Sequence, residues 1–263
     1  MGILNVTPDS FSDGGVHFDP QIAIDAAIRM MEEGADLIDV GGESTRPGSE
    51  GVSTEEELRR VMPVVKALAA KGIPVSIDTA KASVAREALA AGAVVVNDVT
   101  AFSDPAMATL CAKTGAAVCL MHMKGTPRTM QVDPWYEDVV EEVRAFLVAK
   151  AICAEQAGIA PQNIWIDPGI GFGKTVGHNL TLLRNLERLE DTGYPVLIGT
   201  SRKSFIGKIL GAPEAPLAAD QRLEGTLATQ MWAQINGARI IRAHDVPQSK
   251  RAIKMIQVLA ARS

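Results

Sequence analysis

"PVSIDTAKASVAREALAAGAVVVND", residues 74–98, shows the alternation that the whole chain repeats. Its two Val/Ile-rich runs, 74–78 and 94–98, flank an Ala-rich stretch, 83–91, with a helical spacing of apolar residues. The runs are nearly continuous in apolar residues, which is typical of strands that are covered on both faces. The stretch therefore predicts a strand, a helix and a second strand parallel to the first.

Runs of the same kind recur along the chain. They are GILNV (2–6), ADLIDVG (35–41), PVSID (74–78), VVVND (94–98), AVCLMH (117–122), IWIDPG (164–169), PVLIGTS (195–201) and ARIIRAHD (238–245). Helical patterns between them include 22–33 and 54–71, and STEEEL (53–58) resembles an N-cap followed by an acidic first turn. Two long connections, at about 123–135 and 204–219, follow the fifth and seventh runs.

Eight strands alternating with eight helices predict right-handed crossovers and an α/β fold. The simplest closure is a (β/α)8 TIM barrel, which takes about 250 residues, and a doubly wound open sheet is the alternative. No Pro/Ser-rich linker or change in composition interrupts the chain, so we predict a single domain over residues 1–263.

The composition is that of an ordinary globular protein, with 47% apolar and 22% charged residues. The net charge is −5 and no block of Lys or Arg forms a nucleic-acid footprint, so we expect no nucleic-acid partner. Three cysteines without a CxxC pair favour a reducing compartment over a disulfide framework. Since no run approaches the ~20 apolar residues of a membrane span and no secretory signal leads the chain, we expect a cytoplasmic location and no membrane partner.

A polar side chain stands at or near the end of every apolar run. In chain order these are Asn5, Asp39, Asp78, Asn97, His122, Asp167, Ser201 with Lys203, and Arg242 with His244. The carboxyl ends of all strands in a barrel meet on one face, so these side chains are expected to converge on one mouth. Capping of the following helices is the alternative at any one position. The set as a whole favours a shared site.

DPGIGFGKT, residues 167–175, has the glycines of a phosphate loop but not their spacing. The Walker pattern requires Gly where Pro168 stands, and the dinucleotide pattern GxGxxG requires Gly where Lys174 stands. We interpret the glycines as letting the backbone pass close to a flat ligand, with Phe172 available to stack on it.

Two other chemistries stay open at this point. A catalytic zinc needs about three protein ligands, and the strand ends offer only His122 and His244, so a His₂–Asp site is one alternative. Lys203 could form a Schiff base, as in an aldolase. Arg202 beside it and Asp167 one strand away favour a lysine that stays charged and donates hydrogen bonds.

Long motifs accompany the apolar runs. They are MGILNVTPDSFSDGG (1–15), DVGGESTRPG (39–48), SIDT (76–79), NDV (97–99), MHM-G-P--MQ (121–131), DPGIGFGK (167–174), SRKSFIG (201–207) and R-HDV (242–246). In this order they closely resemble dihydropteroate synthase, a family of folate-pathway enzymes, over essentially the whole chain. The resemblance implies a (β/α)8 barrel, usually a homodimer, that joins 4-aminobenzoate to (7,8-dihydropterin-6-yl)methyl diphosphate with Mg²⁺ present. The products are 7,8-dihydropteroate and pyrophosphate, and the family is the target of sulfonamides, which imitate aminobenzoate.

The resemblance also implies roles for the matching residues. The edge of the pterin ring would be bound by Asp78, Asn97, Asp167 and Lys203, and its faces would be covered by Met121 and Phe172. A carboxylate, an amide and an ammonium together match the donors and acceptors of an aminopyrimidinone. Arg242 would lie against the ring or reach the phosphates, and His244 would meet the β-phosphate. The implied catalytic set is therefore Asp78, Lys203, Arg242 and His244.

Further implied roles concern the metal and the second substrate. Asn5 would ligate Mg²⁺ beside the diphosphate, with Asp39 supporting the same region. The aminobenzoate pocket would be built by Phe11, Thr45, Arg46 and Pro47, and Ser201 would bind the carboxylate. As a hypothesis, the bond to the diphosphate breaks first, and the amine attacks the resulting cation beneath the polar loops 5–15 and 39–53, which exclude water.

Two further interpretations share part of this pattern. Methyltetrahydrofolate-dependent methyltransferases bind a pterin in a similar barrel, but they are expected to lack the TPDSFSDGG loop and the paired SRKS and RAHDV segments. A non-catalytic pterin-binding barrel would keep Asp78, Asn97 and Asp167 without needing Asn5 as a metal ligand. Family members usually carry a segment before the first strand, so we expect that Met1 is internal to a longer product or that the barrel bottom is covered otherwise. Sulfonamide susceptibility and oligomeric state do not follow from the sequence.

Overall fold

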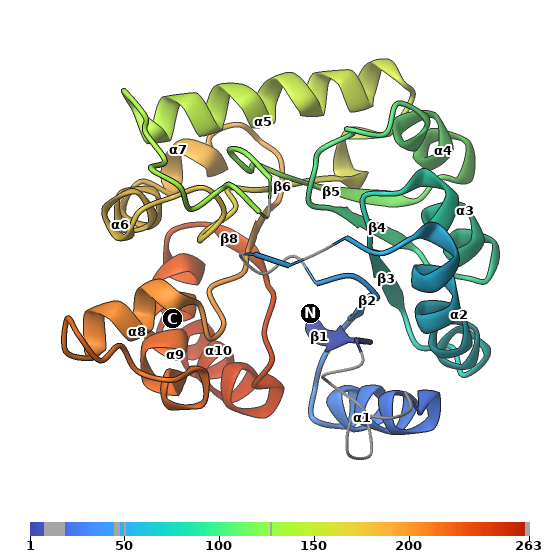
Figure 1. The fold of residues 1–263 in the computed structure, drawn as a ribbon, viewed down its shortest axis with the longest axis horizontal. Coiled ribbons are helices and arrows are strands. Elements are labelled where there is room, and N and C mark those ends of the chain that lie inside the picture. The colour runs from blue at the N-terminus through green and yellow to red at the C-terminus, as the bar shows by residue number, and fades with distance from the viewer. Residues whose placement is uncertain (8–18, 45–47, 50, 127, 261–263) are drawn as a thin grey trace.

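Eight parallel strands form one sheet, in which each strand pairs with the next one along the chain (Figure 1). The computed structural model describes residues 1–7, 19–44, 48–49, 51–126 and 128–260. The strands are β1 (Gly2–Asn5), β2 (Ile38–Gly41), β3 (Val75–Asp78), β4 (Val95–Asp98), β5 (Ala117–Met121), β6 (Ile164–Asp167), β7 (Val196–Ile198) and β8 (Ala238–Ile241). Each predicted run contains one of them, so the predicted α/β class and the parallel order are confirmed.

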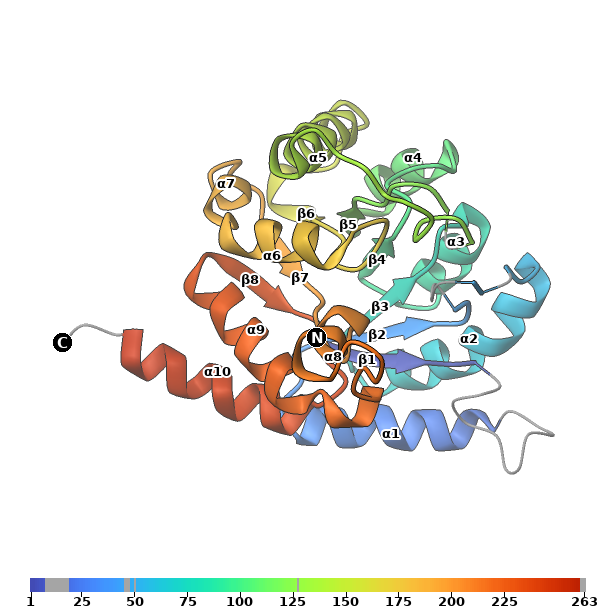
Figure 2. The same ribbon diagram turned by 60° about the vertical axis from the view of Figure 1, so that its left-hand side comes forward.

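The helices lie outside the curled sheet (Figures 1 and 2). They are α1 (Pro20–Glu32), α2 (Thr54–Ala70), α3 (Ala82–Ala90), α4 (Ala106–Thr114), α5 (Val139–Gln156), α6 (Val176–Arg184), α7 (Glu187–Glu190), α8 (Ser204–Leu210), α9 (Leu223–Ile235) and α10 (Val246–Ala260). The prediction of eight helices was therefore too low for the part of the chain that the structure describes. The short α7 and α8 are the additional helices, and α8 occupies the start of the predicted connection at 204–219.

Helix starts follow from local chemistry. The predicted cap at Ser53 is confirmed, because its hydroxyl accepts a hydrogen bond from the Glu56 N–H at 3.2 Å, at the start of α2. Asp19 caps α1 in the same way, with its carboxylate accepting from the Gln21 N–H at 2.8 Å, and Pro20 occupies the first helical position. These caps fix where each helix leaves the loop after its strand.

The chain after β8 returns to β1. Gly2 and Ala243 form a parallel bridge, in which the Ile3 N–H donates to the Ala243 carbonyl at 3.0 Å and the Ala243 N–H donates to the Met1 carbonyl at 3.0 Å. The first and last strands of the sheet are therefore brought next to each other.

Strand register decides which side chains share a face. Asn5 pairs with Gly41, Gly41 pairs with Asp78, and Asp78 pairs with Asn97. Directly paired residues of neighbouring strands project to the same side of the sheet, and successive residues alternate. Asn5, Asp78 and Asn97 therefore point to the concave inner side of the sheet, while their neighbours point outward to the helices. His122 follows the inward Met121 and packs outward against Phe146 of α5, so the predicted convergence does not include it.

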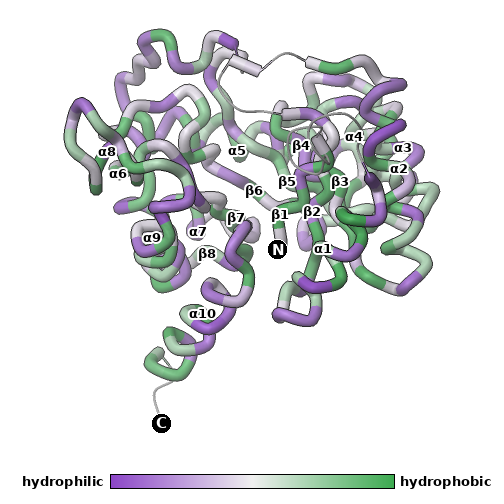
Figure 3. Tube along the Cα trace, turned by 60° about the horizontal axis from the view of Figure 1, so that its bottom comes forward, coloured by the Kyte–Doolittle hydropathy of each residue, from purple (hydrophilic) through white to green (hydrophobic). Residues whose placement is uncertain are grey.

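The outward side chains form the core between sheet and helices. Fully buried examples are Leu4, Ile38, Ile77, Leu120 and Ile166. Burying each of them contributes on the order of 1.5–3 kcal/mol relative to leaving it in water. Figure 3 shows the corresponding pattern, in which most helices carry hydrophilic and hydrophobic residues in alternation. Among the described residues, no helix is both long and apolar enough to cross a membrane.

Candidate active site

Four inner side chains from four strand ends form one hydrogen-bonded group, which we call the carboxylate cluster: Asp39, Asp78, Asn97 and Arg242. Arg242 donates from Nε to Asp39 Oδ2 at 2.6 Å and from Nη2 to Asp78 Oδ2 at 2.7 Å. Asn97 Nδ2 donates to the same Asp39 oxygen at 3.0 Å. The chain positions joined are up to 203 residues apart. The predicted convergence of these strand ends is therefore observed.

Burial sets the electrostatics of this cluster. Asp39 has no exposed surface, and its Oδ1 has no hydrogen-bond partner in the described structure. Burial raises the pKa of Asp78, and the neighbouring Asp39 carboxylate adds to the effect, although the Arg242 guanidinium opposes it. Burial by itself lowers the pKa of Arg242, but Asp39 and Asp78 outweigh it and raise that pKa. Arg242 is thus held as a cation shared between two carboxylates.

The carboxyl ends of the strands form one face of the sheet, which we call the strand-end face. The carboxylate cluster occupies one half of it, and lysines are prominent in the other half. Lys203 donates from Nζ to the Ile170 carbonyl at 2.6 Å, and the same Nζ lies 4.0 Å from the centre of the Phe172 ring. Burial lowers the pKa of Lys203 to about 8, with the nearby Asp167 acting in the opposite direction. The pKa of Asp167 is raised by burial, although its carboxylate accepts a hydrogen bond from the Gly169 N–H at 2.7 Å. Lys203 and Asp167 are therefore close enough for each to shift the pKa of the other.

Two of the glycines after β6, Gly169 and Gly173, are explained by contacts within the protein. Gly169 and Gly173 have φ angles of +67° and +61°, in the left-handed region. A Cβ at Gly169 would lie 1.9 Å from the His122 carbonyl oxygen, and a Cβ at Gly173 would lie 2.3 Å from that of Lys124. The close approach is therefore to the chain's own backbone after β5, and the flat-ligand interpretation is not needed to explain these two glycines.

Ser201 lies beside His244. The Ser201 hydroxyl oxygen accepts from the His244 N–H at 3.1 Å and is 3.0 Å from its Nδ1. Ser201 is thus next to the residue for which the resemblance implies a phosphate contact. Its predicted role at the aminobenzoate carboxylate stays a prediction.

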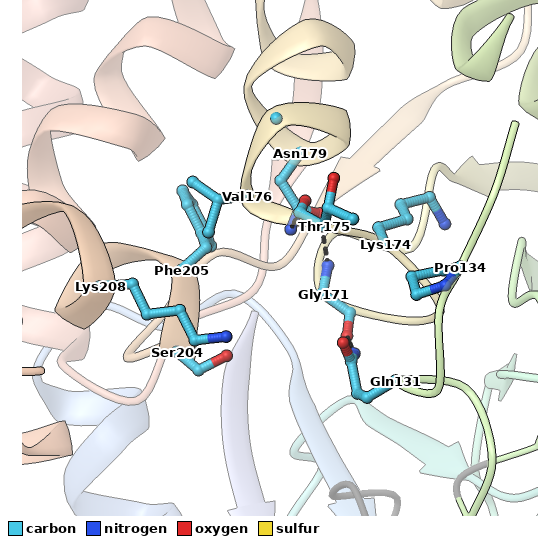
Figure 4. A pocket seen from close by; sticks show the side chains of 11 residues that line it. Gln131, Pro134, Gly171, Lys174, Thr175, Val176, Asn179, Ser204, Phe205 and Lys208 are labelled. Carbon is cyan, nitrogen blue, oxygen red and sulfur yellow. Dashed lines mark hydrogen bonds between the residues drawn. The ribbon is translucent and has the colours of Figure 1, made fainter. Parts of the chain in front are cut away.

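A pocket of about 420 Å³ lies between α8, the β6–α6 loop and the segment after β5, and Gly171, Lys174 and Ser204 are among the residues that line it. Figure 4 shows Ser204 and Lys208 projecting from α8 on one side, while Gln131 approaches Gly171 from another. Gln131 Nε2 donates to the Gly171 carbonyl at 2.7 Å. Sequence reasoning missed Gln131, Ser204 and Lys208, although the spacing of four between Ser204 and Lys208 places them on one helix face.

The remaining predicted residues differ in how far the structure describes them. Asn5 is half-buried at the end of β1, and no hydrogen bond to its amide is found within the described ranges. Met121 is buried at the end of β5, and Phe172 is half-buried. The predicted aminobenzoate residues Phe11, Thr45, Arg46 and Pro47 lie outside the described residues. Among the residues described, no three His, Cys, Asp or Glu side chains are grouped to hold a metal ion.

Comparisons with known proteins agree with the geometry. Residues 1–244 match the family described as pterin binding enzyme. The chain is 47% identical over 258 residues to dihydropteroate synthase of Escherichia coli (strain K12), covering 98% of this chain and 90% of that protein. A solved Xanthomonas albilineans dihydropteroate synthase with 4-aminobenzoic acid has a TM-score of 0.93 at 46% identity, covering 100% of this chain and 93% of that one.

A second solved structure, dihydropteroate synthase from Xanthomonas albilineans in complex with 7,8-dihydropteroate, has a TM-score of 0.89 at 44% identity. It covers 100% of this chain and 94% of that one. Both likenesses extend over nearly the full length of the partners compared. The chain belongs to the pterin-binding enzyme family and, within it, to the dihydropteroate synthases.

Proposed function

We propose that this chain joins 4-aminobenzoate to (7,8-dihydropterin-6-yl)methyl diphosphate, giving 7,8-dihydropteroate and pyrophosphate. The observation that supports this proposal most strongly is the convergence of the carboxylate cluster on one side of the sheet. Lys203 and Phe172 lie near it and contact each other. This arrangement offers carboxylate, amide and cationic groups around one inner space. Membership of the family and the ligands named for its solved members support the same substrates.

The pterin ring is proposed to bind between the carboxylate cluster on one side and Lys203 with Phe172 on the other. Asp78 uses one carboxylate oxygen for Arg242, so its other oxygen is available to accept N–H groups of the ring. Asn97 can both donate and accept, and Lys203 donates only. The ring faces would then contact Met121, at the end of β5, and Phe172, in the loop between β6 and α6.

The pocket between α8 and the β6–α6 loop is proposed as the place of 4-aminobenzoate. It is bordered by Ser204 and Lys208, which supply a hydroxyl and a cation for a carboxylate. Phe11, Thr45, Arg46 and Pro47 would complete it, as the resemblance implies. Ser201, which contacts His244, is better placed for the diphosphate side than for this carboxylate.

Asn5 fits a role as a magnesium ligand. Its amide oxygen is the hard, neutral donor that Mg²⁺ accepts, and Mg²⁺ sites at phosphates take only one or two protein ligands and keep several waters. Bound there, Mg²⁺ would neutralise part of the charge of the diphosphate. The absence of competing side-chain hydrogen bonds at Asn5, within the described ranges, leaves this oxygen available.

The proposed chemistry needs no protein nucleophile. The C–O bond to the diphosphate breaks and its electron pair leaves with pyrophosphate, so a cation remains that is delocalised into the dihydropterin ring. The amine lone pair of 4-aminobenzoate then bonds to the methylene carbon, and the nitrogen loses one proton. Arg242, held in place by two carboxylates, and His244 stabilise the departing charge by preorganised electrostatics.

A coupled pyrophosphate assay tests the proposal. Wild-type protein should release pyrophosphate and form dihydropteroate when both substrates are present, and a sulfonamide should compete with 4-aminobenzoate. Asn5→Ala should lower turnover far more than the affinity for the pterin, because the metal acts mainly on the leaving group. No pyrophosphate release, or methyl transfer to a corrinoid instead, would contradict the proposal.

The order of bond breaking has its own test. With the pterin diphosphate alone, the stepwise scheme predicts slow pyrophosphate release and a product of water attack on the cation. If cleavage always requires 4-aminobenzoate, then the amine takes part in the bond-breaking step and the stepwise scheme is wrong.

We also propose that the curled sheet closes into a (β/α)8 barrel within a single domain. The bridge between Gly2 and Ala243 supports closure, and so does the Arg242–Asp39 hydrogen bond, which joins the chain after β8 to β2. A single domain should unfold in one cooperative transition seen alike by circular dichroism and Trp fluorescence. Two separated transitions would contradict the proposal.

A cytoplasmic homodimer is the proposed state in the cell. Large apolar side chains are exposed on α9 and α10, namely Trp232, Ile235, Met255, Val258 and Leu259. Such a patch favours association. Sedimentation equilibrium should give twice the chain mass, and Leu259→Glu should shift it towards the monomer if α10 takes part.

The cytoplasmic location is proposed from the cysteines. Cys111, Cys119 and Cys153 are free thiols, which fits a reducing compartment.

A further inference from the structure

Lys174 is a buried lysine to which the proposed reaction gives no role, although it lines the pocket proposed for 4-aminobenzoate. Its side chain is only 2% exposed. Nζ lies 2.9 Å from His122 Nδ1, 3.0 Å from the Phe172 carbonyl oxygen and 3.4 Å from the His122 carbonyl oxygen. An ammonium has three N–H donors and no acceptor, so these three acceptors match its full hydrogen-bonding capacity. All three of these partners are neutral.

His122 is suited to accept from this ammonium. Its ring is 7% exposed and packs edge-on against Phe146, with the ring centres 5.0 Å apart. Burial, together with the neighbouring Lys174, lowers the pKa of His122 to about 3. The imidazole is therefore neutral at physiological pH. An Nδ1 that accepts from Lys174 requires the ring hydrogen on Nε2.

Lys174 thereby links two segments that border the substrates. His122 follows β5 directly, and Phe172 lies in the loop between β6 and α6. The same loop fixes Lys203 twice, because the Ile170 carbonyl accepts from its Nζ and the Phe172 ring lies 4.0 Å from it. A displacement of this loop would therefore move both Lys203 and the Phe172 ring.

We propose that Lys174 is a positioning residue that fixes the β6–α6 loop against the end of β5. It thereby sets the place of Lys203 and Phe172, which the proposed function puts on the pterin ring, and of Gly171, which borders the proposed 4-aminobenzoate pocket. The inference rests on the proposed function, since it concerns the binding of 4-aminobenzoate. Lys174 acts through these neighbours and does not touch the reacting atoms. Figure 4 shows its side chain extending away from Ser204 and Lys208, on the other side of the pocket.

A Lys174→Met variant separates positioning from mere support of the fold. Methionine keeps the length and the apolar stem but removes every N–H donor. We expect a folded protein whose KM for 4-aminobenzoate rises about tenfold and whose kcat falls about tenfold, because small misplacements of binding groups are costly. The dissociation constant for the pterin diphosphate should rise by a smaller factor, because Asp78 and Asn97 hold the ring independently of this loop and only Lys203 and Phe172 depend on it.

Lys113→Met is the matched control, because Lys113 is an exposed lysine on α4 and should leave every parameter unchanged. Lys174→Gln retains two N–H donors and should recover part of the affinity for 4-aminobenzoate. An unchanged KM in Lys174→Met, with activity lost only in proportion to folded protein, would overturn the inference. If Lys174→Met does not fold, the Gln variant decides: an unchanged KM for 4-aminobenzoate overturns the inference, and an increase supports it.

Failure of the proposed function is distinguishable from failure of this inference. If wild-type protein forms no dihydropteroate, the proposed function is wrong whatever the variants do. If wild-type protein is active and the Lys174 variants keep its KM for 4-aminobenzoate, only the positioning role is wrong. The two results come from the same assay.

Discussion

The two halves of the strand-end face hold their buried charges in opposite ways. In the carboxylate cluster, the Arg242 guanidinium forms ion pairs with both Asp39 and Asp78, so the buried charges there have charged partners. In the lysine-rich half, which we call the lysine cluster (His122, Phe172, Lys174 and Lys203), ammonium groups meet backbone carbonyls, a ring face and an imidazole nitrogen. The first half pairs its one cation within the protein and has one carboxylate in excess, whereas the second keeps positive charge available for a ligand.

Burial acts on both halves by the same rule, with opposite results for acids and bases. Loss of water disfavours any charged form, so it raises the pKa of Asp78 and Asp167 and lowers that of Lys203 to about 8 and that of Lys174 to about 7. An anionic substrate that enters between the halves would therefore stabilise the ammonium forms. This difference separates variants that damage the fold from variants that damage only the reaction.

The largest effect is expected from Arg242→Met, which breaks the carboxylate cluster. Two buried carboxylates would lose their shared cation, and breaking such buried pairs costs about 3–5 kcal/mol. We expect a fall of that order in the free energy of unfolding, measured by urea denaturation, together with loss of dihydropteroate formation.

Arg202→Met is the control for Arg242→Met. Arg202 pairs with Asp245 on the surface, and its side chain is 41% exposed. That pair is worth about 1 kcal/mol or less. Equal losses in the two variants would show that Arg242 is not a buried structural cation.

Lys203→Met should have the opposite profile. Because burial already disfavours its charge, removing the ammonium should change the free energy of unfolding by less than about 1 kcal/mol, while kcat/KM falls ~10²-fold or more. Thermal unfolding and steady-state kinetics of the same preparation check both parts. A strongly destabilised variant that retains its activity would remove the distinction between the two halves.

Much of the fold follows from local patterns in the sequence. The apolar runs located all eight strands because each run is short, rich in Val and Ile and followed by a helical pattern. Helix α8 was missed, since Ser204–Leu210 is a short apolar stretch that leads into GAPEAP, which is a strong turn signal. Helices of this length carry too few residues for a periodic pattern to be distinguished.

The site was predictable as a set of strand ends but not as a set of contacts. Asp78, Asn97 and Arg242 were found because a parallel sheet brings the carboxyl ends of its strands together. The sequence gives no sign that Gly169 and Gly173 face the carbonyls of another loop, or that Lys174 is buried, because both depend on how two loops approach in space. The same holds for Ser201, whose contact with His244 joins residues 43 positions apart.

An intermediate effect is expected when the lysine cluster is tested by pH. His122 has a folded-state pKa of about 3 against an ordinary value of 6.5, so the unfolded chain binds the proton that the folded protein does not. Its contribution to stability is therefore complete above pH 6.5 and is lost as pH falls towards 3. The loss amounts to about 1.4 kcal/mol per pH unit within that window.

His122→Leu should flatten this part of the pH dependence. The quantity to measure is the difference in unfolding free energy between wild type and variant at several pH values from 6.5 to 4. The raised pKa values of Asp78 and Asp167 act with the opposite sign in the same window, but they are common to both proteins and largely cancel in the difference. A difference that does not vary with pH would mean that His122 is protonated in the folded protein or does not titrate in this window.

The smallest effect concerns single hydroxyl groups at the two tyrosines of the chain. Tyr136 is 7% exposed, and its hydroxyl donates to the Gly173 carbonyl at 2.8 Å, so it helps to hold the loop on which the lysine cluster depends. Tyr136→Phe leaves that carbonyl unsatisfied and should cost about 1–1.5 kcal/mol of unfolding free energy.

Tyr194→Phe is the control. It removes a hydrogen bond of 2.7 Å to Glu155 at an exposed site, and we expect it to cost no more than about 0.5 kcal/mol of unfolding free energy. A modest rise in KM for 4-aminobenzoate should accompany the first variant only, because only Tyr136 contacts the β6–α6 loop. If the two variants are equally mild in both measurements, the loop is held without this hydroxyl, and its placement depends on Lys174 and the glycines alone.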